Sequence, residues 1–181
     1  RWGLILFIVI IMIGTTFSFV FFGFSPVKET NKYKGFAFTK AAGGFWVTDV
    51  NGVQAAFSYL PMDVEKIEVY NNSLANLNGK LEVDITSEVN STFKGDIALA
   101  EHQMELTLIN FGIFMRGGFT DENPFNIPVI SCNQSTSTVP VVYMRQGNVT
   151  NIHLDGECII AEAASGDDII KVKDRILYSM M

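Results

Sequence analysis

The sequence predicts an α+β protein, in which an N-terminal transmembrane helix precedes one mostly antiparallel sheet domain with two main helices packed on one face of the sheet. Residues 4–24 form an uncharged and mostly apolar run, which predicts the transmembrane helix. Later segments alternate apolar and polar residues around two-residue turns, as β-hairpins do. Two further segments repeat apolar residues at helical spacing. We therefore expect an anchor at residues 1–27 and one folded domain at residues 28–181.

The apolar run is long enough to cross a bilayer. Its 21 residues would rise roughly 31 Å as a helix, against a hydrocarbon core of about 30 Å. Fifteen of them are Leu, Ile, Val or Phe, which favours insertion by very roughly 4 to 9 kcal/mol. A buried core helix would be shorter, and a cleaved signal peptide would end in small residues at a cleavage site. The run instead continues to Phe24-Ser25-Pro26, which predicts an uncleaved signal-anchor.

Charges beside the span give conflicting indications of its orientation. Arg1 favours a cytoplasmic N-terminus under the positive-inside rule. The other side of the span carries several lysines, which favour the opposite orientation: Lys28, Lys32, Lys34 and Lys40. Because the chain opens with Arg rather than Met, we also expect residues upstream of Arg1.

Two other features favour a domain outside the cytosol. An even number of cysteines suits an oxidising compartment. Four Asn-x-Ser/Thr tripeptides fall at predicted loops or strand ends, although Asn and Ser also gather in turns for conformational reasons. The glycosylation candidates are Asn71, Asn90, Asn133 and Asn148.

Composition excludes some classes of partner and indicates no cofactor. The formal net charge of −6 argues against binding of nucleic acid or anionic lipid through a broad basic patch. The sequence has neither a glycine pattern that cradles phosphate nor a G-x-S-x-G elbow. We therefore expect no nucleic-acid partner and no cofactor.

The first half of the domain is predicted to be a meander of strands. Residues 25–34 should be a polar tether, and strands should follow near residues 36–38, 45–50 and 53–59. Asn51-Gly52 predicts the hairpin turn before the last of these strands. One face of this sheet is aromatic and requires a cover. A short helix near residues 60–66, a short strand, a loop and a strand at residues 81–86 complete this half.

The second half contains the two main helices. The first is predicted at residues 96–114, where Gly117-Gly118 would stop it; its apolar stripe is Ile97, Ala100, Met104, Leu108 and Phe111. The second begins at Ser165 in the manner of a capping box and carries the stripe Ile169, Val172, Ile176 and Met180. Between the helices we predict strands near residues 127–132, 139–145, 149–154 and 157–164.

The two cysteines predict a disulfide. A bond between Cys132 and Cys158 would close a loop of about 26 residues and contribute roughly 3.5 kcal/mol in the chain-entropy model. Two buried free thiols are the first alternative. A nucleophilic Cys132 paired with His153 is the second, although nothing in the sequence places a base beside the thiol.

One acidic cluster has the spacing of metal ligands. Glu101, His102 and Glu105 lie within two turns of the predicted helix, and such residues can bind a metal together. A metal requires three or four ligands, however, and His153 is the only other histidine. The same cluster is also what the solvated face of a helix contains.

Several stretches resemble the small uncharacterised single-pass membrane proteins of DPANN-type archaea. They are Trp2-Gly3-Leu4-Ile5, Phe57-Ser58-Tyr59-Leu60-Pro61, Cys158-Ile159-Ile160-Ala161-Glu162-Ala163 and Lys173-Asp174-Arg175-Ile176-Leu177-Tyr178. The resemblance concerns the general layout over most of the chain. It implies an uncleaved helix and paired cysteines, and it implies no activity.

These observations lead to one expected function and two alternatives. We expect a non-catalytic, membrane-anchored domain outside the cytosol that binds or organises another membrane or envelope component. Its partners would be the bilayer, through residues 4–24, and a protein. The first alternative is a membrane-bound enzyme, either metal-assisted or thiol-based. The second is an accessory subunit of a larger membrane complex with the span as an interface.

Overall fold

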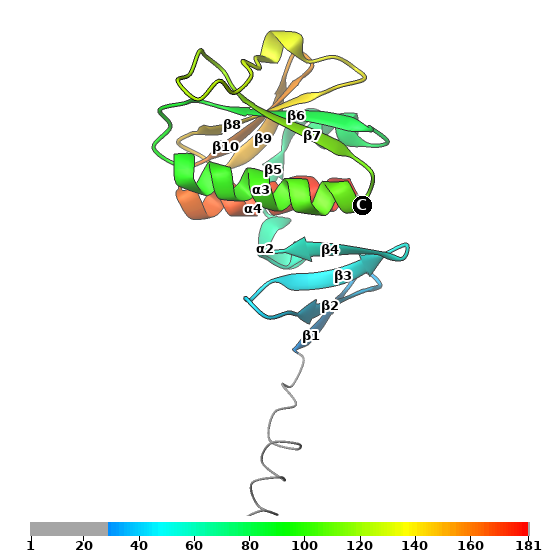
Figure 1. The fold of residues 1–181 in the computed structure, drawn as a ribbon. Coiled ribbons are helices and arrows are strands. Elements are labelled where there is room, and N and C mark those ends of the chain that lie inside the picture. The colour runs from blue at the N-terminus through cyan, green and yellow to red at the C-terminus, as the bar shows by residue number, and fades with distance from the viewer. Residues whose placement is uncertain (1–28, 181) are drawn as a thin grey trace, which may run out of the picture.

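The computed structural model describes residues 29–180 (Figure 1). The predicted span at residues 4–24 lies outside the described residues. Within residues 29–180, no helix has both the length and the apolar character needed to cross a bilayer.

The first sheet is a four-stranded antiparallel meander in the order β1-β2-β3-β4. Its strands are β1 (Thr30–Tyr33), β2 (Phe36–Lys40), β3 (Trp46–Val50) and β4 (Val53–Phe57). The predicted turn at Asn51-Gly52 is confirmed, because both residues have positive φ. The predicted tether is wrong in its last part, where β1 lies. Lys34 and Gly35 have φ values of 45° and 92° and form a second two-residue hairpin turn, which Lys rarely indicates.

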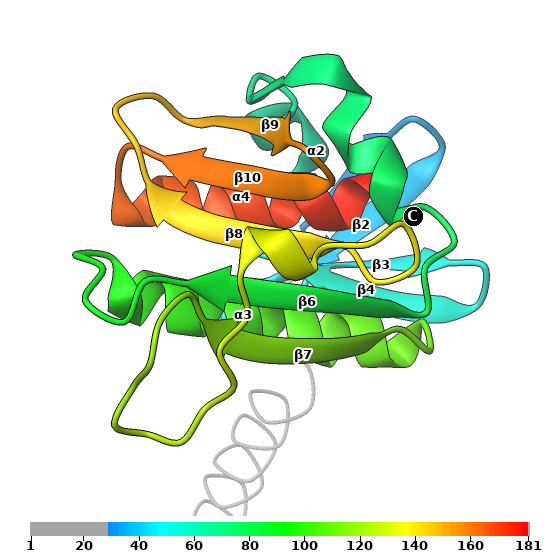
Figure 2. The ribbon, with the colours of Figure 1, turned by 90° about the horizontal axis from the view of Figure 1, so that it is seen from above.

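The second sheet has six strands in the order β5-β9-β10-β8-β6-β7 (Figure 2). They are β5 (Glu68–Val69), β6 (Glu82–Ser87), β7 (Phe114–Phe119), β8 (Val141–Gln146), β9 (Asn151–Asp155) and β10 (Cys158–Ala163). Only β9 and β10 pair antiparallel, and the other pairings are parallel. The predicted single, mostly antiparallel sheet is therefore wrong. Alternation along a strand shows which face is buried and does not show the direction of its neighbour.

The main helices are α3 (Lys94–Asn110) and α4 (Gly166–Ser179). The predicted capping of α4 is confirmed, because the Ser165 side chain accepts a hydrogen bond from the Asp168 N–H. The predicted end of α3 is wrong. Gly112, with φ of 71°, ends this helix, and the Ile113 N–H donates to the Leu108 carbonyl at 3.0 Å, as in a Schellman motif. Gly117 and Gly118 then belong to β7.

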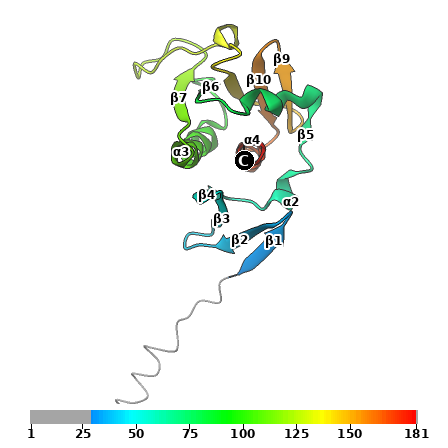
Figure 3. The ribbon, with the colours of Figure 1, turned by 90° about the vertical axis from the view of Figure 1, so that its right-hand side faces the viewer.

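The three layers of the domain share one core. Helices α3 and α4 cover one face of the six-stranded sheet, and the four-stranded sheet packs on their other side (Figures 1 and 3). A single cluster of buried side chains runs through all three layers and includes Phe57, Ile176 and Ile159. Short helices complete the chain: α2 (Pro61–Val64), η1 (Tyr70–Leu77) and η2 (Cys132–Gln134).

Hydrogen bonds attach the four-stranded sheet to the helices. Asp174 of α4 accepts the backbone N–H groups of Ser58 and Tyr59 at 2.9 and 2.8 Å. The Tyr178 hydroxyl donates to the Tyr59 carbonyl at 2.7 Å. On the other side, Asn110 of α3 donates to the Gln54 carbonyl at 3.2 Å and so covers the free edge of β4.

Candidate functional site

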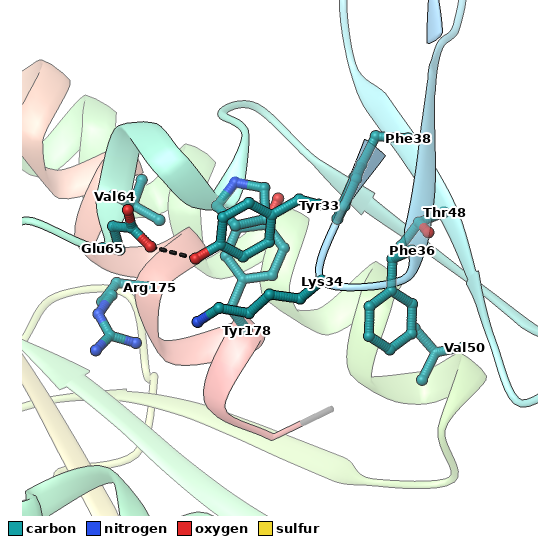
Figure 4. Close-up of a pocket in the computed structure, with 11 residues that line it drawn as sticks. Tyr33, Lys34, Phe36, Phe38, Thr48, Val50, Val64, Glu65, Arg175 and Tyr178 are labelled. Carbon is teal, nitrogen blue, oxygen red and sulfur yellow. Dashed lines mark hydrogen bonds between the residues drawn. The ribbon is translucent and has the colours of Figure 1, made fainter. Parts of the chain in front are cut away.

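A cavity of about 230 Å³ lies where the four-stranded sheet faces α2 and α4 (Figure 4). The inner face of the sheet supplies Phe36, Phe38 and Val50, while Val64 of α2 and Tyr178 of α4 close the other side. These walls are apolar and largely aromatic. The helical layer covers most of the aromatic face of the sheet and leaves this part open.

Tyr178 fixes the shape of one wall. Its ring stacks on Phe57 with centroids 3.9 Å apart, and it meets the edge of Phe38 at 6.1 Å. Its hydroxyl donates a hydrogen bond to the Tyr59 carbonyl. Burial and this bond together hold the ring in one orientation. The cavity is therefore formed before any ligand enters.

Thr48 contributes a buried hydroxyl to this apolar cavity. The residue is only 4% exposed, and its Oγ1 has no hydrogen-bond partner among the described residues. A buried hydroxyl without a partner destabilises a folded protein by about 1 to 3 kcal/mol. The contrast is Thr86, also buried, whose hydroxyl donates to the Ile130 carbonyl at 2.7 Å.

Two cations stand at the cavity, on different elements. Lys34 belongs to the β1–β2 turn and Arg175 to α4, and the Lys34 side chain extends past Tyr178 (Figure 4). Neither cation forms an ion pair within residues 29–180. The Nε of Arg175 is buried and has no hydrogen-bond partner there.

Among the described residues that line the cavity, Glu65 is the one with a carboxylate. The Tyr33 hydroxyl donates to Glu65 at the rim (Figure 4). The Tyr33 side chain raises the pKa of Lys34, and Glu65 adds to this effect, while the charge of Arg175 opposes it. Lys34 is therefore charged at neutral pH, and it stands close enough to Arg175 for the two to repel.

This arrangement can hold a molecule. Among the described residues that line the cavity there is no His, Cys or Ser, and the groups that could act as nucleophiles are the hydroxyls of Tyr33 and Thr48 and the amine of Lys34. An apolar body with a few placed polar groups is the usual make-up of a binding pocket.

The predicted disulfide is confirmed. Cys132 of η2 and Cys158 of β10 are bonded, with their Cα atoms 5.1 Å apart. Their bond lies with Ile130, Val141 and Ile160 in a small apolar cluster separate from the main core. Two free thiols and a nucleophilic Cys132 acting with His153 are both wrong, because neither cysteine carries a free thiol.

The acidic cluster on α3 does not form a metal site in the part of the chain that the structure describes. Within residues 29–180, no three His, Cys, Asp or Glu side chains are placed to hold a metal. His102 and Glu105 are exposed, whereas Glu101 turns inward. Burial raises the pKa of Glu101 to about 7, and its Oε1 has no hydrogen-bond partner. The metal-assisted alternative therefore gains no support.

All four glycosylation candidates are accessible. The side chains of Asn71, Asn90, Asn133 and Asn148 are exposed, although Ser73, the hydroxyl residue of the first tripeptide, is buried. Their modification remains a prediction.

The sequence did not reveal the cavity, because its residues are spread over five elements. The prediction of a strand near residues 45–50 did not say which of its side chains face inward, and in β3 these are Trp46, Thr48 and Val50. The alternation of Trp46, Thr48 and Val50 was the one available indication in the sequence that an apolar sheet face contains a polar group.

Comparison with family models, with curated proteins and with solved structures gives no match.

Proposed function

We propose that this protein is a membrane-anchored domain outside the cytosol that binds a small, largely apolar molecule of its membrane or envelope, without catalysis. The uncharged run at residues 4–24 supports the anchor. The disulfide supports an oxidising compartment, and the four exposed Asn side chains of the Asn-x-Ser/Thr tripeptides support a location outside the cytosol. The cavity between the sheet and α4 supports the binding role.

The single observation that carries the proposal is the hydroxyl of Thr48. Thr48 lines the apolar cavity, and its hydroxyl is buried and has no partner among the described residues. A hydroxyl that destabilises the free protein is accounted for if the Thr48 side chain turns it into the cavity and a ligand supplies its partner, because groups at binding sites often reduce stability.

Replacing this hydroxyl separates a binding role from a structural one. In Thr48→Val, we expect the melting temperature of the full chain in phosphatidylcholine nanodiscs to rise by about 2 to 4 °C, because an unpartnered buried hydroxyl is removed. In the matched control Thr86→Val, we expect a fall, because the Ile130 carbonyl loses its donor. Equal destabilisation by both changes would show that the Thr48 hydroxyl is structural.

Binding itself can be measured with a neutral probe, 4-fluorobenzyl alcohol, followed by ¹⁹F NMR. We expect saturable binding to the full chain in nanodiscs, and we expect Thr48→Val to weaken it about three- to tenfold by removing one hydrogen bond. Val50→Trp, which fills the cavity, should abolish binding while circular dichroism reports an intact fold. Unsaturable signal, or unchanged binding in both variants, would contradict a binding role for this cavity.

The location can be tested by protease treatment of intact cells. The domain should be digested, and a tag placed before Arg1 should be protected, if the N-terminus is cytoplasmic. Survival of the domain in intact cells, with digestion only after permeabilisation, would place it on the opposite side of the membrane.

A further inference from the structure

We propose that the ligand of this cavity is a small organic anion, with an apolar body between the aromatic walls and an acid group held by Lys34 and Arg175. This inference rests on the proposed binding function and adds the chemical class of the ligand. It is carried by the placement, beside one apolar cavity, of two cations that form no ion pair within residues 29–180; Lys34 contacts the Tyr33 ring, with its Nζ 5.0 Å from the ring centroid.

The two cations converge although nothing in their own elements requires it. Lys34 stands in a turn where its φ of 45° is unusual for Lys, and Arg175 comes from the distant α4 (Figure 4). Like charges at one site repel, and an anion beside them lowers this repulsion. The Glu65 carboxylate, which accepts from the Tyr33 hydroxyl, supplies one negative charge near Lys34, so the two cations and this carboxylate leave one excess positive charge.

Arg175 also favours an acid group with two oxygens. A guanidinium binds a carboxylate or phosphate through two parallel N–H groups. Here the Nε is buried and has no partner within the described residues, so the ligand would meet the terminal nitrogens, and the Nε–H only if the side chain turns. A cationic ligand would be attracted to aromatic rings, but Lys34 and Arg175 would repel it.

The cavity size limits the apolar body of the ligand. A cavity of about 150 Å³ is enough for benzene, and this one measures about 230 Å³. A single ring or a short aliphatic chain with an acid group therefore fits. Phe36, Phe38 and Tyr178 offer the faces and edges on which an aromatic ring packs.

The test compares an acid with the alcohol of the same shape. The probes are 4-fluorophenylacetate and 4-fluorobenzyl alcohol, measured by ¹⁹F NMR on the full chain in phosphatidylcholine nanodiscs. We expect the acid to bind about tenfold more tightly or better, as bonds to charged groups allow. Arg175→Gln should remove that preference and leave binding of the alcohol within about twofold. Lys34→Gln should reduce the preference in the same direction.

Two further variants keep the result interpretable. Arg175→Lys retains the positive charge but lacks the two parallel N–H groups of the guanidinium, so it should bind the acid with intermediate affinity. Lys40→Gln removes an exposed cation of the same sheet that does not line the cavity and already pairs with Glu29, so acid binding should be unchanged. Circular dichroism on each variant verifies that the fold is intact.

The outcomes separate this inference from the proposed function. Equal binding of acid and alcohol to the unmodified protein would overturn the inference that the ligand is an anion, while the proposed binding function stands. A parallel loss of both in Arg175→Gln would do the same. Failure of both probes to bind would remove both proposals. A dissolved acid and a membrane-borne one share this chemistry. Displacement of bound 4-fluorophenylacetate by octanoic acid in the nanodisc, and not by the same concentration of water-soluble butyrate, would identify the membrane as the source.

Discussion

The side chains of Glu101 and Asp174 both place a carboxyl group inside the helical layer, but they differ in their hydrogen bonds. Glu101 of α3 is mostly buried and its Oε1 has no partner within the described residues. Asp174 of α4 is fully buried, accepts two backbone N–H groups and contacts Lys173. Burial raises the pKa of Asp174 and lowers that of Lys173, while the contact between them opposes both shifts. The first carboxyl therefore limits stability, and the second holds two layers together.

The Glu101 carboxyl should make stability depend on pH. Its pKa is about 7 in the folded protein, against an ordinary value of 4.5. Between these values the folded state binds the extra proton, so the free energy of unfolding should fall by about 2 to 3 kcal/mol as pH rises from about 4.5 to 7, and no further above it. Glu101→Gln should remove this loss, as urea unfolding at pH 5 and pH 8 would show.

The exposed Glu105 of the same helix is the matched control. Glu105→Gln should leave the pH dependence unchanged, because this side chain stays in water in both states. A pH dependence that survives in Glu101→Gln would assign the effect to other groups.

Removing Asp174 should loosen the four-stranded sheet. In Asp174→Ala, the Ser58 and Tyr59 N–H groups lose their acceptor and the buried Lys173 loses its counter-charge. Breaking such a buried pair destabilises by about 3 to 5 kcal/mol, which urea unfolding of the full chain would measure. Glu157→Ala, at an exposed turn, should change stability by less than about 0.5 kcal/mol. A loss below that level in Asp174→Ala would mean that the sheet is held by apolar packing alone.

Among the elements, the disulfide joins the segment after β7 to the face of the six-stranded sheet that lies away from the helices. Residues 128–130 of this segment lie very close to Gly118 in β7. A Cβ added to Gly118 would lie 2.6 Å from the Ile130 side chain and 2.7 Å from the Pro128 carbonyl. The bond and this close approach hold the small cluster of Ile130, Val141 and Ile160 in place. That face is therefore ordered by a covalent link rather than by a covering helix.

Reducing the disulfide should affect this face first. We expect Cys132→Ser with Cys158→Ser to lower the free energy of unfolding by up to about 3.5 kcal/mol, since the closed loop no longer restricts the unfolded chain. Hydrogen exchange should become faster in residues 120–140 and stay slow in α3 and α4. Uniformly faster exchange throughout the domain would contradict a local role for the bond.

The sequence predicted the elements better than their pairing. The turn at Asn51-Gly52 and the Ser165 cap were readable, because each is fixed by local chemistry. The direction of β6, β7 and β8 was not readable, because it depends on the crossover through α3. The outer face of α3 was misleading as well: Leu99, Leu106 and Ile109 are exposed, so this helix is apolar on more than one side.

The candidate site was beyond sequence reasoning for a related reason. The disulfide was predicted, because its prediction requires only two cysteines and an oxidising compartment. The cavity forms only where the β1–β2 turn lies close to the C-terminal half of α4, and no local sequence pattern predicts this long-range contact. Lys34 and Arg175 therefore looked like ordinary surface charges in the sequence.

At the scale of the whole molecule, the two sheets share one core through the helices between them. Phe38 and Trp46 of the first sheet belong to the same buried cluster as Ile85 and Ile159 of the second. Neither sheet could expose its inner face to water without losing much of this burial. The layers should therefore unfold together.

Unfolding should be a single transition, whichever layer is observed. In Trp2→Phe, fluorescence reports Trp46 of the four-stranded sheet alone, while far-ultraviolet circular dichroism is dominated by α3 and α4. We expect the two urea curves to coincide. An earlier transition in fluorescence would show that the four-stranded sheet detaches as a separate unit.

Strand β1 has a mechanical consequence. It is the edge of its sheet, four residues long, paired only with β2, and it ends in the turn that carries Lys34. If residues 4–24 anchor the protein as proposed, a force applied to the chain before Thr30 would reach this strand first and separate it from β2 one hydrogen bond at a time. Tyr33 and Lys34 would move with it, so tension would open the cavity and release a bound ligand while the other layers stayed folded.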